Sequence, residues 1–277
     1  MGCYSCVVTV HADAAVGRER RRTVQFIALV LGLFWGFVFF GFIDLMSFAF
    51  GPEFHLALVL ETGWGLLFLF LVGGPLVCLA VRPRSAAPAA IAQIGGAAVA
   101  VAVAAIISAY PVALLVAGGL ASGVVLLAAV GGGACLVIPR RWRLAAAPGL
   151  LVAAATGPAA GYAWASARTT GSQQTTDVTW GIDHWPIQAA FPLTALLAAG
   201  LAAGHPRGWA VTTWSVVAAI IWFAVVCWLE PDLPGSIGRV WSTITFAWAI
   251  AFVPAMYLTT NRRGRQSRAG VVAPRTS

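Results

Sequence analysis

Two carboxylates in an apolar stretch are the residues of this sequence best placed to do chemistry. Asp44 lies eight positions before Pro52 and Glu61 lies nine positions after it, in the segment FFGFIDLMSFAFGPEFHLALVLETGWG. If the chain forms an antiparallel helical hairpin that turns at Gly51–Pro52, both carboxylates lie at similar depth, at most roughly 12–14 Å from the turn. Two carboxylates held close together at low dielectric constant cannot both ionise cheaply. Such a pair holds a proton or binds a cation.

A structural role for these acids is the alternative. If the second helix begins only at Thr62, Glu61 is a solvated residue of its first turn, where the helix dipole favours a negative charge. Asp44 is then the intramembrane acid, and it pairs with Arg239 or Arg168. An ionisable side chain within a span costs about 2.5–3.5 kcal/mol unless it finds a partner or water. The surroundings of Asp44 therefore decide between the two interpretations.

A second polar group lies in the stretch VTWGIDHWPIQ, where Asp183 and His184 stand between two tryptophans. Together with Glu53 and His55 they are candidates for binding an ion or a substrate. Their spacings are too short and too common to indicate zinc or copper, so we predict neither a metal site nor a cofactor. The favoured interpretation is structural, because Pro186 suits the first turn of a helix and Asp183 caps its free N–H groups. His184 becomes functional only if it reaches the acids of the first hairpin.

The remaining motifs predict no catalytic chemistry. Cys3 and Cys6 form a C-x-x-C without a second ligand pair, and the other three cysteines lie in apolar runs, where thiols pack as small apolar groups. The chain contains no nucleophile elbow, zinc-protease helix motif or P-loop. The sequence therefore favours a protein that is not an enzyme.

Composition places these residues in a membrane protein. Of the 277 residues, 60% are hydrophobic and 9% are charged, whereas a soluble domain carries about 25% charged residues. Apolar runs long enough to cross a bilayer as a helix recur from Phe26 almost to the C-terminus. The expected fold class is all-α, a polytopic transmembrane helical bundle of about eight spans. The expected spans are residues 25–50, 55–81, 88–109, 111–138, 144–166, 186–204, 209–229 and 236–258.

Arginines orient the expected bundle. The net charge of +8 comes from arginine because the chain contains no lysine. Arginines fall in both terminal segments and in every alternate connection, and only Arg168 and Arg239 fall on the other side. Since basic residues collect on the cytoplasmic side, we expect a plasma-membrane protein with both termini in the cytoplasm. Its basic side contacts anionic lipid headgroups, and no nucleic-acid partner is expected.

The chain is expected to form one embedded domain. The transmembrane domain comprises residues 23–259, between disordered cytoplasmic tails at residues 1–22 and 260–277. Acids and tryptophans gather at the expected outer side, the tryptophans as a belt at headgroup level. These residues are Asp44, Glu53, Glu61, Asp177, Asp183, Glu230 and Asp232, with Trp180, Trp185, Trp228 and Trp241.

Residue size predicts which helices are central. The spans 88–109 and 111–138 consist mainly of Ala, Gly and Val, and small residues let helices approach closely in lipid. We expect these two spans near the centre. The first, second, seventh and eighth spans carry bulky aromatic residues and are expected to face lipid or a partner. Gly74–Pro75 and Gly157–Pro158 are expected to break their helices.

The segment TWGIDHWPIQAA and the small-residue helix after it resemble a segment of functionally uncharacterised multi-pass membrane proteins of high-GC bacteria. The arginine- and alanine-rich composition is similar in the same way. The resemblance covers Thr179 to Ala203. It implies the membrane class and no activity or catalytic residue.

Two functions from different classes stay open. Acids beside a Gly/Ala-rich hairpin favour a transporter or permease-like protein for a small solute, cation or proton, with Asp44 and Glu61 as its binding carboxylates. Bulky outer walls without a complete motif favour a non-catalytic scaffold, assembly partner or envelope sensor, as a homo-oligomer or with a membrane-protein partner. An enzyme acting on lipid-linked substrates ranks last, because only two arginines lie outside.

Overall fold

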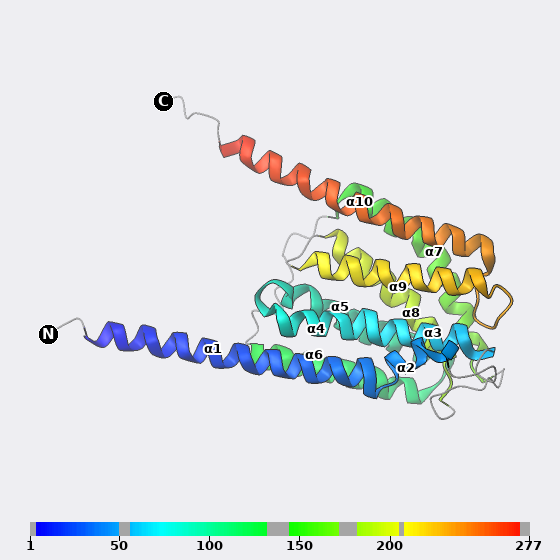
Figure 1. Cartoon of the computed structure of the whole chain (residues 1–277), viewed down its shortest axis with the longest axis horizontal. Coiled ribbons are helices and arrows are strands. Elements are labelled where there is room, and N and C mark those ends of the chain that lie inside the picture. Colours follow the sequence, from blue (N-terminus) through cyan, green and yellow to red (C-terminus); the bar gives the residue numbers. More distant parts are fainter. Residues whose placement is uncertain (1–3, 50–55, 132–143, 172–181, 205–207, 272–277) are drawn as a thin grey trace.

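The computed structural model of the chain is helical, and no strand occurs in the residues that it describes, which are 4–49, 56–131, 144–171, 182–204 and 208–271. The expected all-α bundle is confirmed (Figure 1). The α-helices are α1 (Tyr4–Leu33), α2 (Gly41–Leu45), α3 (Leu58–Gly65), α4 (Gly74–Val81), α5 (Pro83–Ser108), α6 (Pro111–Gly131), α7 (Ala146–Thr169), α8 (Trp185–Ala203), α9 (Trp209–Leu229) and α10 (Gly238–Val271). Two π-helices, η1 (Phe34–Val38) and η4 (Leu66–Gly73), and a 3₁₀ turn, η2 (Ser47–Ala49), complete the described part.

Eight long helical rods run along the bundle, as the apolar runs predict. The elements α3, η4 and α4 join end to end and act as one rod, Leu58–Val81. Within the described ranges, seven helices are long and apolar enough to cross a membrane, and together they make this an integral membrane protein. The remaining rod, α7, has 24 residues, but Gly, Pro, Thr and Ser interrupt its alanine-rich sequence.

The first hairpin differs from the expectation. The first spanning helix ends at Val38 rather than near residue 50. Phe40 then takes a left-handed backbone conformation, with φ of 65°, and the chain turns into the short helix α2. Asp44 therefore lies on a separate element that packs beside α3, and it is not part of a spanning helix.

Both expected tails are helical where the structure describes them. α1 begins at Tyr4 and α10 continues to Val271, so helix extends into both segments, 1–22 and 260–277, that the sequence analysis assigns to the tails. Extending an existing helix is cheap, because the costly nucleus is already formed in the spanning part. Figure 1 shows both extensions leaving the same end of the bundle, and α2 and α3 lying at the opposite end.

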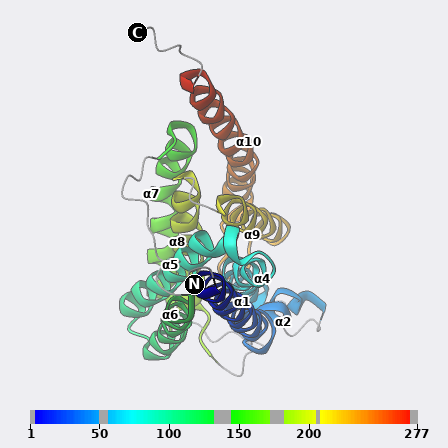
Figure 2. The ribbon, with the colours of Figure 1, turned by 90° about the vertical axis from the view of Figure 1, so that its left-hand side faces the viewer.

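Of the expected central Gly/Ala/Val hairpin, α5 lies inside the bundle and α6 does not. α8 and the rod Leu58–Val81 are the most buried spans, and α5 lies beside α8. α6 lies at the periphery (Figure 2), with Leu115 and Val125 exposed on its outer face. The second span is thus wrongly predicted as an outer wall, since its bulky residues, such as Phe68, fill the core. Bulky side chains are also exposed on the first, seventh and eighth rods, as expected.

Neither Gly-Pro pair ends its helix. Pro75 has no N–H to donate to the Leu71 carbonyl, and the π-helix η4 precedes it. Gln93 of α5 takes over this bond, because its Nε2 donates to the Leu71 carbonyl at 2.9 Å and also to Ser215 Oγ at 2.9 Å. α7 likewise continues through Pro158. Neighbouring side chains can thus satisfy the backbone groups that a proline leaves without a partner.

Candidate functional site

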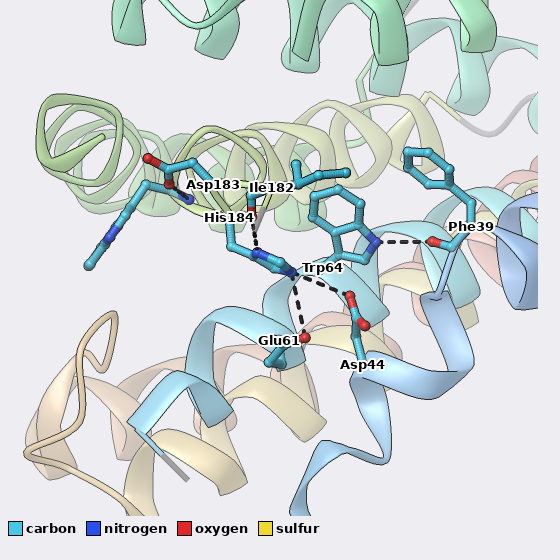
Figure 3. Close-up of polar contacts among 8 residues, drawn as sticks. Phe39, Asp44, Glu61, Trp64, Ile182, Asp183 and His184 are labelled. Carbon is cyan, nitrogen blue, oxygen red and sulfur yellow. Dashed lines mark hydrogen bonds and ion pairs between the residues drawn. The ribbon is translucent and has the colours of Figure 1, made fainter. Parts of the chain in front are cut away.

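Asp44, Glu61 and His184 meet inside the protein, where α2, α3 and the start of α8 pack together (Figure 3). His184 Nε2 lies 3.5 Å from Asp44 Oδ2 and 3.5 Å from Glu61 Oε2. One nitrogen or oxygen atom of each side chain lies within 4.8 Å of the others. The exposed fraction is 0% for both acids and 2% for His184. We call these three residues the acid–histidine cluster.

Two glycines bring Asp44 to Glu61. A Cβ on Gly65 of α3 would lie 2.7 Å from both the Gly41 carbonyl oxygen and the Leu45 backbone nitrogen of α2. A Cβ on Gly41 would lie 2.9 Å from the Trp35 carbonyl oxygen. Side chains at these positions would therefore force α2 away from its neighbours. The short helix reaches its place only because backbone packs directly on backbone.

Trp64 holds the turn that leads into α2. Its Nε1 donates a hydrogen bond to the Phe39 carbonyl at 3.1 Å, beside the left-handed residue Phe40. The same indole lies against His184, with ring centroids 4.6 Å apart. The residue pattern in the sequence does not indicate that Trp64 supports the site. Its position three residues after Glu61, on the same face of a helix, is the signal that would have found it.

His184 presents one defined nitrogen to the acids. Its Nδ1 lies 2.7 Å from the Ile182 carbonyl oxygen. A carbonyl oxygen only accepts, so Nδ1 carries the hydrogen and Nε2 faces the carboxylates. The adjacent Asp183 has the capping role that the sequence predicts, since its Oδ1 accepts from the Trp185 N–H at 2.9 Å. Its other oxygen accepts from the Gly171 N–H at 2.8 Å, so Asp183 does not join the cluster.

Asp44 is a buried acid whose one close polar contact is the 3.5 Å approach of its Oδ2 to His184 Nε2. Neither carboxylate oxygen accepts a hydrogen bond from any residue that the structure describes. Asp44 lies outside the spanning helices, and burial raises its pKa well above the ordinary range, although the imidazole of His184 opposes the rise and Glu61 adds to it. Burial thus favours the neutral, protonated form of Asp44, and only a positive charge beside the carboxylate would favour the ionised form.

The structure contradicts the alternative in which Asp44 pairs with Arg239 or Arg168. Arg239 lies over the ring of Trp228, 5.9 Å from its centroid, and Arg168 lies over Trp164 at the same distance. Both cations are thus placed on aromatic rings and not in the cluster. Glu61 lies in the first turn of α3, as that alternative supposes, but it is buried and not solvated.

Other predicted residues lie elsewhere or cannot be placed. Glu53 and His55 fall outside the described residues. Trp185 is buried, with 6% of its surface exposed, so it is not part of an interfacial belt. Trp228 and Trp241 are each 51% exposed at the end of the bundle that holds the cluster, as expected for a belt.

A second series of hydrogen-bonded polar groups begins one turn after His184. The residue pattern in the sequence does not indicate it. Gln188 is fully buried, and its Nε2 donates to the Tyr162 hydroxyl at 2.5 Å. That hydroxyl donates to the Gly235 carbonyl at 2.5 Å. Tyr162 also lines an apolar cavity of about 600 Å³ between α7, α8, α9 and α10. The cluster itself lies outside this cavity.

Comparison of the chain with protein-family models, with curated proteins and with solved structures finds no match. The geometry of the cluster and its place in a membrane protein therefore indicate its function.

Proposed function

We propose that this protein is a multi-pass membrane permease for a small cation or a proton, and that the acid–histidine cluster is its binding site. The observation that carries the proposal is the meeting of Asp44, Glu61 and His184 in the interior of a bundle of spanning helices. Ionisable residues inside membrane proteins are costly, and they commonly mark ion pathways and proton relays. A purely structural acid would be expected to accept hydrogen bonds, which Asp44 does not do within the described residues.

The backbone around the cluster supports a binding role. The π-helix η1 precedes the turn to α2, and the π-helix η4 follows α3 directly. π-helical segments are rare and occur frequently at functional sites. Interrupted helices also form the ion sites of many transporters, because irregular backbone is tolerated at membrane depth only where it is buried in protein or lines a cavity.

The proposed setting is a plasma membrane with both termini in the cytoplasm and the cluster toward the outer side. Arg18 to Arg22 and Arg82 lie toward the end of the bundle from which both termini extend. That end would contact anionic lipid headgroups. Cations would then reach the cluster from the outer side of the membrane.

Flux measurements test the function. The purified chain is placed in liposomes, and the uptake of H⁺, Na⁺, K⁺, Mn²⁺ and Zn²⁺ is followed with ion-sensitive dyes. We expect one of these cations to enter. Asp44→Asn and Glu61→Gln should each reduce its initial rate at least tenfold, while Asp232→Asn, an acid of the α9–α10 connection, leaves the rate unchanged. The proposal fails if the folded parent moves none of these cations, or if both cluster variants behave like the parent.

A further inference from the structure

We infer that the acid–histidine cluster binds one divalent transition-metal ion, of the class of Mn²⁺, Fe²⁺, Co²⁺ and Zn²⁺. The inference rests on the proposed function in that it names the cation which the permease would carry. It reverses the expectation from sequence that the chain has no metal site. As candidate metal ligands, the sequence pattern groups His184 only with Glu53, His55 and Asp183, which are near it in sequence or on the same expected side.

The types of ligand select the class of metal. Ca²⁺ takes six to eight oxygen ligands, and Mg²⁺ prefers oxygen and keeps several waters. An imidazole nitrogen with carboxylate oxygens suits the first-row transition metals instead. The charge also matches, because two ionised carboxylates neutralise a divalent ion, so a fully buried site carries no net charge.

The distances fit a metal better than a direct ion pair. A charge-assisted N–H···O⁻ bond closes to about 2.7–2.9 Å, whereas His184 Nε2 lies 3.5 Å from each acid. Two ligands bound at about 2.1 Å with a tetrahedral angle between them lie about 3.4 Å apart. The two distances from His184 Nε2 to the acids thus already have about this length. The distance between the two acids is at most 4.8 Å, and no hydrogen bond to the Asp44 oxygens within the described residues opposes a rotation of that carboxylate.

The imidazole is oriented as metal-binding histidines are. Such a histidine almost always donates its other ring N–H to a carboxylate, a backbone carbonyl or water, which fixes its tautomer. In His184 this partner is the Ile182 carbonyl, 2.7 Å from Nδ1. Nε2 is then the nitrogen available for a metal. Asp44 is fully buried, neither of its oxygens accepts a hydrogen bond within the described residues, and its Oδ2 faces this nitrogen (Figure 3).

Metal binding to the purified chain tests the inference. The full-length protein, carrying an affinity tag without histidine, is stripped with a chelator in mild detergent and titrated with Co²⁺ or Zn²⁺. We expect one ion per chain, a visible absorption band typical of tetrahedral Co²⁺, and a rise in melting temperature that Mg²⁺ and Ca²⁺ do not produce. No saturable binding of either metal to the folded parent would overturn the inference, even if no variant were made.

Variants locate the site. Asp44→Asn, Glu61→Gln and His184→Gln should each weaken Co²⁺ binding by more than the ~100-fold that loss of an orienting partner can cost. Asp44→Glu, which keeps the carboxylate, should retain part of the affinity. Asp232→Asn is the matched control and should bind as the parent does. If the three cluster variants fold and bind Co²⁺ like the parent, the metal is held elsewhere and the inference is wrong.

Binding and flux can fail separately. Co²⁺ bound at the cluster without uptake of any cation would refute the permease and leave the metal site standing. Uptake of H⁺, Na⁺ or K⁺ that depends on Asp44, by a protein that binds neither Co²⁺ nor Zn²⁺, would refute the metal site and leave the permease standing.

Discussion

His184 connects two parts of the protein that are distant in sequence. It lies 123 positions after Glu61, and its ring reaches both acids of the first hairpin. The neighbours of the histidine explain this reach. Asp183 caps the first turn of α8, and the Ile182 carbonyl fixes the ring, so the imidazole is held before any ligand arrives. A site oriented in this way loses little freedom on binding.

Trp64→Phe tests how the cluster is supported. Phenylalanine keeps an aromatic ring beside His184 but removes the N–H that bonds to the Phe39 carbonyl. We expect the free energy of unfolding to fall by about 0.5–1.5 kcal/mol, the usual net value of one hydrogen bond. Denaturation of the purified protein by increasing sodium dodecyl sulfate measures the change. The control is Trp241→Phe at a half-exposed position, and equal effects of the two variants would contradict a special role for Trp64.

Two of the three residues of the cluster can be predicted from the sequence to lie together. The equal spacing of Asp44 and Glu61 about a Gly-Pro turn indicates that they lie together, and the structure places them within reach of one imidazole. His184 itself cannot be assigned to them in this way, because no periodicity records which helices pack together. The roles of Trp64 and Gln188 are hidden for the same reason, since each depends on a contact with another helix.

The short helix α2 is the element on which the site depends. It has five residues, too few to be stable alone, and it follows a residue in a left-handed conformation that costs roughly 1–2 kcal/mol. Close packing against α3 at Gly65 compensates for both disadvantages. Sequence patterns predict long helices well, because an apolar run must hide its backbone in lipid. They do not show that the first spanning helix, α1 with η1, ends at Val38, since the residues of α2 and η2 continue the same apolar run.

Gly65→Ala tests this dependence. The new methyl group would meet backbone atoms of Gly41 and Leu45 at 2.7 Å, which cannot rotate aside. We expect a loss of about 1–3 kcal/mol in unfolding free energy, together with weaker Co²⁺ binding, because α2 would carry Asp44 away from His184. Detergent denaturation and metal titration measure the two effects.

Gly118→Ala in α6 is the matched control. No atom of another residue lies within 4 Å of a Cβ built there, so the usual gain of about 0.5–1 kcal/mol for alanine in a helix should appear. Metal binding should not change. If Gly65→Ala behaved like this control, α2 would not be fixed by close packing.

At the scale of the molecule, hydropathy predicts the number of rods but not their arrangement. The eight expected spans correspond to eight observed rods, because each apolar run is long enough to cross a bilayer. Residue size is a weaker guide to the centre. Alanine-rich α8 and α5 lie inside, whereas α6, of similar composition, faces outward with valine and leucine. In lipid an exposed leucine has no cost, so composition alone does not separate a buried helix from a peripheral one.

The orientation of the bundle in the membrane follows from the distribution of its charged residues. Five described acids, Asp44, Glu61, Asp183, Glu230 and Asp232, lie on elements at the end that holds the cluster, whereas Glu19 lies among the basic residues Arg18 to Arg22 toward the other end, where Arg82 also lies. The positive-inside tendency then places Arg82 in the cytoplasm and Asp232 outside. In a variant whose five cysteines are replaced by serine, Asp232→Cys should react with a membrane-impermeant maleimide in intact bacteria. Arg82→Cys should react only after permeabilisation. The reverse pattern would invert the protein and expose the cluster to the cytoplasm, so that any cation would be loaded from inside the cell.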